Sequence, residues 1–219
     1  MRKGEEEMEL LQKISEELQK GNYEEIPKLV QEALNANIPP SKILSDGLVA
    51  GMDVVGEKFR RDEFFMPEVL ISARAMQAGM NILRPKLIET GAKLAGKIVL
   101  GTVKGDLHDI GKNLVGMLME GAGFQVIDLG IDVPSERFVE AVKMNRPNIL
   151  GLSSLLTTTM PKMKEVIESL VEAGVRGKVK VMVGGAPVTE KFAKDVGADA
   201  YAPEAASAVE KARELIGRE

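Results

Sequence analysis

The spacing of hydrophobic residues along this chain changes once, close to residue 90. Before that point, apolar side chains recur at the i, i+3, i+4 and i+7 positions that share one face of an α-helix. Turn-forming pairs such as Gly21-Asn22 and Pro39-Pro40 interrupt the repeat. Helices joined by short connections predict a small antiparallel four-helix bundle. The predicted helices cover residues 8–18, 26–34, 41–59 and 67–87.

Two prolines mark the predicted ends of the fourth helix. Pro67 suits a first helical turn, where its missing N–H costs no hydrogen bond. Pro85 lies near the other end, and a proline inside a helix removes a hydrogen bond and clashes with the preceding turn. We therefore expect the helix to kink or stop at Pro85.

After residue 95, short apolar runs rich in β-branched residues alternate with stretches of helical period. Such strands, separated by helices, form parallel sheets with right-handed crossovers. The fold class is therefore α/β, with an N-terminal helical bundle followed by a doubly wound, parallel, five-stranded sheet. We expect a helical domain over residues 1–90, a linker over 91–96 and an α/β domain over 97–219. The predicted strands are 97–103, 124–129, 149–153, 179–183 and 200–201, and the predicted helices are 113–122, 136–144, 161–173, 190–196 and 205–216.

Composition narrows the classes of function. The chain has 219 residues, of which 44% are hydrophobic and 28% charged, the usual balance of a soluble globular protein. Its net charge is −4, so we expect no basic surface for nucleic acid. Neither a signal peptide nor a run of about 18 apolar residues is visible, which predicts a cytoplasmic protein that does not enter a membrane. The absence of cysteine excludes disulfides.

Polar side chains and glycines follow three of the predicted strands. Gly105 and Asp106 come after the first strand, a run of hydroxyls begins at Ser153 after the third, and Gly184-Gly185 follow the fourth. In open parallel sheets, ligands bind beyond the carboxyl ends of the strands. The sequence therefore predicts a site for a polar ligand at that edge of the sheet.

The only histidine, His108, belongs to the same edge and follows Asp106 by two residues. Imidazole is the commonest protein ligand of transition metals, and a carboxylate commonly holds its second nitrogen. With one histidine and no cysteine, the chain cannot build a zinc cluster or a Cys-His nucleophile pair. A metal held here must take most of its ligands from outside the protein, which points to a macrocycle.

Three motifs at these strand ends make the chain resemble cobalamin-binding domains. Residues 106–111 match the pattern Asp-x-His-x-x-Gly, residues 153–155 match Ser-x-Leu, and residues 184–185 match Gly-Gly. Upstream, residues 51–59 and 65–70 are similar to the helical cap of methionine synthase and of the small corrinoid proteins of methanogens and acetogens. The resemblance covers most of the chain and implies a Rossmann-like, flavodoxin-like cobalamin domain behind a helical cap.

The resemblance implies roles for three residues near cobalt. His108 would displace the cofactor's own benzimidazole and bind cobalt from below. Asp106 would accept a hydrogen bond from the other imidazole nitrogen and so fix its tautomer and basicity. Thr159 stands where the family usually has a serine whose hydroxyl contacts the aspartate. The alternative for the run from Thr157 to Thr159 is that it satisfies the amides of the next helix.

Other residues would contact the rest of the cofactor. Phe59 and Met66 would cover the upper face of the corrin, whereas Ser153, Leu155 and Thr157 would line the slot for the displaced nucleotide tail. The further contacts implied by the resemblance are Gly105, Leu107, Asp109, Gly111, Gly184, Gly185 and Ala205.

Several of these assignments have a plain structural alternative. Asp109 directly precedes a helix, and we favour a role as its N-cap. The pair Gly184-Gly185 would also serve an ordinary tight turn between a strand and a helix. Phe59 and Met66 have the helical spacing of core residues.

The function implied by the resemblance is that of a corrinoid methyl carrier, with methylcobalamin as its loaded state. A substrate-specific methyltransferase would methylate Co(I), and a second methyltransferase would take the methyl group from methyl-Co(III). A reductive activase is a further implied partner. Beyond the cofactor motifs no general acid, base or substrate pocket is evident, so we expect a subunit and not a complete enzyme. The alternatives are a cobalamin-dependent sensor or regulator and the cobalamin subunit of a carbon-skeleton mutase.

Overall fold

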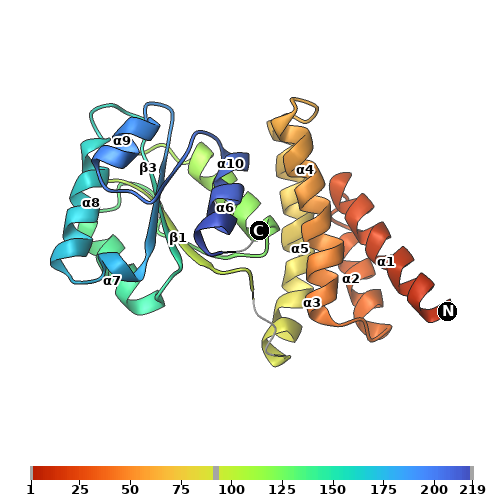
Figure 1. Ribbon diagram of the computed structural model, residues 1–219. Helices are drawn as coiled ribbons and strands as arrows, with labels where there is room; N and C mark the ends of the chain where they lie inside the picture. Colours follow the sequence, from red (N-terminus) through yellow and green to blue (C-terminus); the bar gives the residue numbers. More distant parts are fainter. Residues whose placement is uncertain (1, 91–93, 218–219) are drawn as a thin grey trace. The chain divides into compact units, whose positions relative to one another are not determined.

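The computed structural model describes residues 2–90 and 94–217 of the chain. It divides into two compact units: Met1–Ala95 with Glu120–Gly123, and Gly96–Met119 with Phe124–Glu219. The first unit is helical and the second is built on a β-sheet (Figure 1). Residues 91–93 of the predicted linker lie outside the described part of the chain.

The helical unit confirms the predicted arrangement of four successive helices. The third of them is one continuous helical run in which a π-helical stretch separates two α-helical segments. Leu11, Ile14 and Leu18 recur along one face of the first helix and are buried, as their spacing predicts. The segments are α1 (Arg2–Gln19), α2 (Ile26–Asn35), α3 (Pro40–Lys42), η1 (Ile43–Val49), α4 (Ala50–Arg60) and α5 (Met66–Glu89).

Helix α5 continues past Pro85 to Glu89, so of the two expected effects of this proline the stop is wrong, and the kink stays a prediction. Pro85 lacks an N–H, but Leu83 and Leu87 on either side of it are both buried. The Thr90 hydroxyl also donates a hydrogen bond to the carbonyl of Lys86 at 2.9 Å. Packing and this terminal hydrogen bond hold the last turn of the helix.

The second unit confirms the predicted five-stranded, all-parallel sheet. The strand order is β2-β1-β3-β4-β5. The strands are β1 (Lys97–Thr102), β2 (Gln125–Asp128), β3 (Ile149–Ser153), β4 (Lys180–Gly184) and β5 (Ala200–Ala202). The helical segments are α6 (Ile110–Gly121), α7 (Ser135–Asn145), α8 (Pro161–Glu172), η2 (Arg176–Lys178), α9 (Glu190–Asp195) and α10 (Ala205–Leu215).

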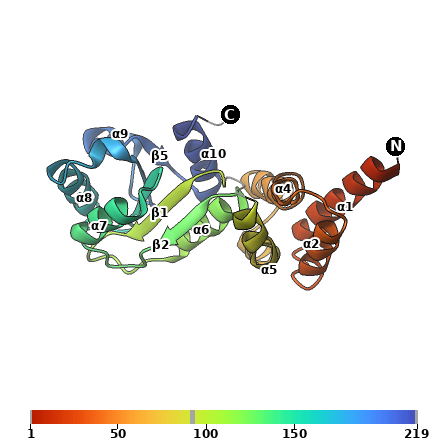
Figure 2. The same cartoon turned by 90° about the horizontal axis from the view of Figure 1, so that it is seen from below.

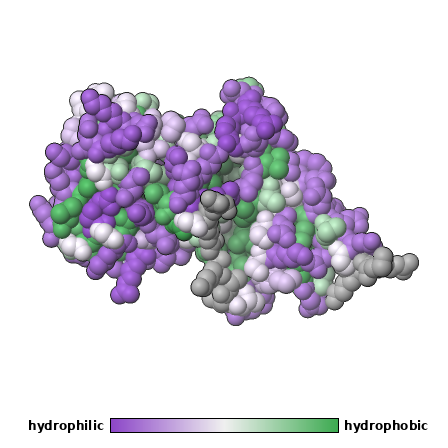
Figure 3. All heavy atoms as spheres, in the orientation of Figure 1, coloured by the Kyte–Doolittle hydropathy of each residue, from purple (hydrophilic) through white to green (hydrophobic). Residues whose placement is uncertain are grey.

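Helices cover both faces of the sheet, as a doubly wound fold requires. Helices α7, α8 and α9 lie on one face, and α6 and α10 on the other (Figures 1 and 2). The main core of the first face joins Val99, Leu150 and Val181 of the strands to Phe138 and Met163 of the helices. Polar residues predominate on the outer surface drawn in Figure 3, which agrees with helices that bury their apolar sides.

The register of the sheet brings the three sequence motifs to one edge. Thr102 at the end of β1 is paired with Ser153 of β3, and Ser153 is paired with Gly184 of β4. The chain runs from β1 outward to β2 and then crosses to β3 on the other side of β1. This reversal of strand order places the switch point between the carboxyl ends of β1 and β3.

Helix α6 begins at Ile110, three residues before its predicted start. The hydrophobic period could not show this first turn, because Ile110 is 73% exposed. Gly111, which follows it, has a low helix propensity. The structure therefore places Gly111 inside the helix.

Candidate functional site

The side chain of His108 is fixed by the carboxylate of Asp106. Its Nδ1 lies 2.7 Å from Oδ1 of Asp106, and its backbone N–H donates to the same oxygen at 3.1 Å. Half of the histidine side chain remains exposed, whereas the aspartate is fully buried. Because Nδ1 is engaged, Nε2 is the ring nitrogen that can accept a metal.

The second oxygen of Asp106 is held by the β3–α8 loop. Oδ2 accepts the backbone N–H of Leu155 and the hydroxyl of Thr159, both at 2.8 Å. Burial of Asp106 opposes its ionisation, but the hydrogen bonds from Leu155, His108 and Thr159 outweigh it and hold the pKa of this carboxyl far below its usual range. The carboxylate is therefore ionised at neutral pH.

The hydroxyl of Thr159 contacts Asp106 and not the start of helix α8. That helix has Met160 at its N-cap position, with no hydrogen bond from the Met160 side chain to the helix amides. The Thr159 Oγ1 also lies 3.0 Å from the carbonyl oxygen of Leu156. The geometry favours the Asp106 contact over the helix-start alternative for Thr159.

Two buried hydroxyls that the sequence did not single out complete this network. Ser154 Oγ lies 2.7 Å from Thr159 Oγ1 and 3.4 Å from Oδ2 of Asp106. Thr102 donates its hydroxyl to the backbone carbonyl of His108 at 2.8 Å. Ser154 is the unspecified middle residue of the Ser-x-Leu motif, so the motif did not draw attention to it. Thr102 is the last residue of a buried strand, and its residue type gives no sign of a contact six residues along the chain.

Both glycines at the end of β4 lie close to backbone atoms of the protein that a Cβ would approach. A Cβ on Gly185 would lie 1.8 Å from the carbonyl oxygen of Ser154, and the φ of Gly185 is +128°. A Cβ on Gly184 would lie 2.9 Å from the carbonyl oxygen of Ala202. The fold thus requires glycine at position 185, and contact of either glycine with a cofactor tail stays a prediction.

Apolar residues next to His108 in the sequence have exposed side chains. Leu107 is 68% exposed and Ile110 73%, and on the neighbouring loop Leu155 is 42% exposed. No atom lies within 4 Å of the place where a Cβ on Gly111 would stand. An available nitrogen with exposed apolar side chains on its own loop and on the neighbouring loop suits a large, partly apolar ligand.

The other predicted contacts lie at the expected strand and helix ends. Asp109 immediately precedes α6, and its Oδ2 accepts a hydrogen bond from the side chain of Asn113 at 3.1 Å. Gly105 has a φ of +82° in the loop between β1 and α6. Ser153 is partly buried, Thr157 is exposed and Ala205 is buried in the first turn of α10.

The two predicted cap residues lie in the helical unit. Phe59 is the penultimate residue of α4, and Met66 is the first residue of α5. Both side chains are partly buried, and Phe65 between these helices is 64% exposed. Their contact with a corrin stays a prediction.

The described residues fit a macrocyclic metal better than a bare ion. Among them no group of three or more histidine, cysteine, aspartate and glutamate side chains could hold a metal ion. Only the half-exposed imidazole of His108 offers a free nitrogen beside an ionised, fully buried carboxylate. This donor set agrees with one axial ligand to a metal whose remaining ligands come with the cofactor.

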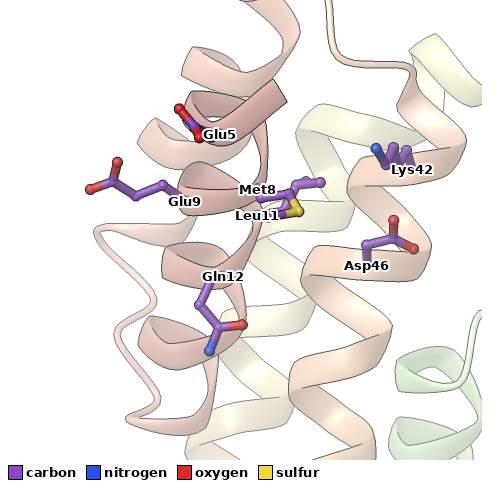
Figure 4. A pocket seen from close by; sticks show the side chains of 7 residues that line it. All are labelled: Glu5, Met8, Glu9, Leu11, Gln12, Lys42 and Asp46. Carbon is purple, nitrogen blue, oxygen red and sulfur yellow. The ribbon is translucent and has the colours of Figure 1, made fainter. Parts of the chain in front are cut away.

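A cavity of about 620 Å³ lies in the helical unit, on α1 and the start of the third helix (Figure 4). Met8 and Leu11 form its apolar part, and Lys42 on its far side is paired with Glu7. None of the predicted site residues lines it, so it is distinct from the His108 site. Its lining residues are Glu5, Met8, Glu9, Leu11, Gln12, Lys42 and Asp46.

Within the described residues, every helix is too short or too polar to span a bilayer.

Comparisons with known proteins show the family to which the chain belongs. A model of the B12 binding domain matches residues 96–213, and a second B12 binding domain model matches residues 10–84. Dimethylamine corrinoid protein 1 of Methanosarcina mazei is 46% identical to this chain, over 95% of this chain and 96% of the relative.

Two solved structures share the fold over nearly the whole chain. The methanol:cobalamin methyltransferase complex of Methanosarcina barkeri matches with a TM-score of 0.85 and 34% identity, over 95% of this chain and 80% of that one. A cobalamin-binding protein of Desulfitobacterium hafniense matches with a TM-score of 0.77 and 35% identity, over 94% and 98%. The chain therefore belongs to the family of B12-binding corrinoid proteins.

Proposed function

We propose that this chain is the corrinoid methyl carrier of a methyltransferase system. The observation that carries the proposal is the hydrogen bond between His108 Nδ1 and the buried, ionised Asp106, with Nε2 left available at the switch point of the sheet. When bound, cobalamin supplies a cobalt centre that accepts and donates a methyl group. The protein's part is to supply one axial nitrogen whose strength it can adjust.

The adjustment comes from the pair formed by His108 and Asp106. While Nε2 binds the metal, Asp106 holds the proton on Nδ1 and increases the electron density of the imidazole. The buried carboxylate thereby fixes the orientation and the tautomer of the ring and leaves Nε2 as the available nitrogen.

The partners follow from the family. One relative is a dimethylamine corrinoid protein, and one matching structure is a methyltransferase complex. We propose a substrate-specific methyltransferase for a methylated amine as the donor partner and a second methyltransferase as the acceptor partner. A reductive activase and a cytoplasmic location stay predictions.

The two compact units are proposed as separate domains with separate tasks. The α/β unit would bind the lower face and the tail of the cofactor, using the slot beside Ser153, Leu155 and Thr157. The helical unit would cover the upper face with Phe59 and Met66 until a partner enzyme displaces it.

Electron paramagnetic resonance of the Co(II) protein tests this function. The protein is reconstituted with cobalamin, with and without ¹⁵N-histidine. Because His108 is the only histidine, a label-dependent change of the axial nitrogen splitting from a triplet to a doublet identifies it as the ligand. A splitting that ignores the label would mean that benzimidazole stays bound. Failure to retain any corrinoid, or no methyl turnover with amine-specific methyltransferases, would contradict the carrier function.

Replacing Thr159 by valine should weaken the site without changing its shape. Valine matches threonine in volume but cannot donate to Oδ2 of Asp106, and a hydrogen bond to a charged group contributes roughly 1.5–3 kcal/mol. We expect the free energy of unfolding of the apoprotein to fall by about that amount, and the pKa of Asp106 to rise toward its usual value. Denaturant unfolding measures the first effect. Thr159→Ser keeps the hydroxyl and should behave like the wild type, and equal loss in both variants would rule out the hydrogen bond as the cause.

A further inference from the structure

The connection between β2 and α7 is hydrogen-bonded to the start of the loop that carries His108. Oδ1 of Asp132 accepts the backbone N–H of Gly105 at 2.7 Å, and the N–H of Asp132 donates to the carbonyl of Asp106 at 3.0 Å. Lys104 lies within 3.4 Å of the same carboxylate. The Gly105 N–H holds the pKa of Asp132 below its usual value, so this acceptor is charged.

Both residues at this contact have a positive φ, which is uncommon for the aspartate. The φ of Asp132 is +51° and that of Gly105 is +82°. A left-handed conformation at a residue other than glycine persists only where its surroundings hold it, although aspartate and asparagine adopt it more readily than most. The reciprocal hydrogen bonds between the two segments supply that restraint.

The start of helix α6, which follows this loop, is held by Asp128, the last residue of β2. Its Oδ2 accepts a hydrogen bond from Nζ of Lys112 in the first turns of α6, and its Oδ1 accepts the N–H of Gly130 at 2.9 Å. The Lys112 side chain is only 3% exposed. A buried ammonium is costly unless it is paired, and Nζ of Lys112 is paired with Asp128 and also donates to Oδ1 of Asn113 at 2.7 Å.

Between these two anchors the loop has little packing of its own. Residues 107–111 are all exposed, including His108. Segments with few buried contacts open most readily. The position of the imidazole therefore depends on the hydrogen bonds around it, which are those of Asp106, Thr102 and the two carboxylates of the β2–α7 side.

We propose that Asp128 and Asp132 are positioning residues that hold both ends of segment 105–112 and so fix where His108 presents Nε2. The proposal rests on the function proposed above, in which Nε2 is the axial ligand of cobalt. It extends the support of the ligand from its direct partner, Asp106, to two carboxylates, Asp128 and Asp132, that bond Lys112 and Gly105 at the two ends of the segment.

Three variants at left-handed positions test the Asp132 contact. Asp132→Ala removes the acceptor, whereas Asp132→Asn keeps a carbonyl oxygen and tolerates the positive φ. Arg146→Ala is the matched control, since Arg146 has a φ of +47° in the same unit, at the end of α7. Asp128→Ala probes the other anchor independently, in case Asp132→Ala fails to fold.

Two measurements are made on each variant. Amide hydrogen exchange of the apoprotein reports the opening of segment 105–112, and the ¹⁵N-histidine splitting of the Co(II) cobalamin complex reports the His108-bound fraction. Asp132→Ala and Asp128→Ala should each speed exchange in the segment and weaken cobalamin binding by about tenfold, at the low end of losses seen for outer partners of metal ligands. Asp132→Asn should restore most of the wild-type behaviour, and Arg146→Ala should leave both readouts unchanged.

Wild-type exchange and wild-type binding in both alanine variants would overturn the proposal and leave the carrier function untouched. Equal losses in Asp132→Ala and Arg146→Ala would also overturn it, because backbone strain alone would then explain them. A wild-type spectrum without any label-dependent splitting would instead contradict His108 as the ligand, and the exchange data would still decide whether the two carboxylates hold the segment.

Discussion

Replacing His108 by alanine should abolish the axial histidine splitting of the Co(II) spectrum. No other histidine is available in the chain to take its place. Loss of an outer partner of a metal ligand costs about 10–100-fold in affinity or activity, so loss of the ligand itself should cost about 100-fold or more. The fold should survive, because the His108 side chain is half exposed and its removal forfeits a hydrogen bond contributing about 1 kcal/mol.

Cobalamin titration, methyl-transfer rates and thermal unfolding measure these effects. Added imidazole provides the control, since it can occupy the vacated axial position and should restore an unlabelled nitrogen splitting. Wild-type affinity and methyl-transfer rate in the alanine variant would show that the imidazole is not a functional ligand.

The second large effect is expected for Asp106→Asn. Both carboxylate oxygens accept hydrogen bonds from N–H groups: Oδ1 from His108 and Oδ2 from Leu155. In asparagine an NH2 group replaces one of the two acceptor oxygens. In either orientation of the amide, that NH2 faces an N–H donor. We expect the free energy of unfolding to fall by about 1–3 kcal/mol and cobalamin affinity to fall by about 10–100-fold.

The pH dependence of stability separates this effect from a general loss of packing. The pKa of Asp106 is lower in the folded than in the unfolded chain, so the carboxylate stabilises the fold above the unfolded pKa of about 3.9. That contribution is lost as pH falls through the folded pKa. The stability difference between wild type and Asp106→Asn should therefore be largest near pH 7 and shrink as pH falls below about 4.

Urea unfolding of both proteins from neutral to acid pH measures this difference. Asp195→Asn is the control, because Asp195 is exposed at the end of α9 and should cost nothing measurable at any pH. A constant difference between wild type and Asp106→Asn across the range would show that the loss is steric and independent of charge.

Hydrophobic spacing alone predicted the order and type of every main element. It succeeded because strands such as Ile149–Ser153 are short apolar runs and helices such as α1 bury one regular face. It failed where burial gives no signal. The first turn of α6 carries the exposed Ile110. The expected stop at Pro85 came from the chemistry of proline and not from spacing, and α5 keeps its last turn there because Leu87 is buried.

The candidate site was visible in part for a similar reason. His108 and Asp106 stand close in sequence and belong to a pattern, so their contact could be expected. Three further contacts each have as one partner a backbone group that any residue carries. These groups are the N–H of Leu155, the His108 carbonyl that accepts from Thr102, and the Gly105 N–H that donates to Asp132. Only the folded chain shows which backbone groups meet, and sequence patterns therefore miss these contacts.

The close approach of Gly185 to Ser154 also affects how related sequences should be compared. A Cβ at position 185 would overlap the Ser154 carbonyl whether or not a cofactor is present. Glycine at position 185 is thus required by the folded sheet itself, whether or not it also contacts a cofactor. A descendant of this protein that had abandoned its cofactor would be free to change His108 and Asp106 long before it could change Gly185. In a genome survey, a chain that keeps this glycine but lacks the histidine should be counted as sharing the sheet and not as carrying the same metal ligand.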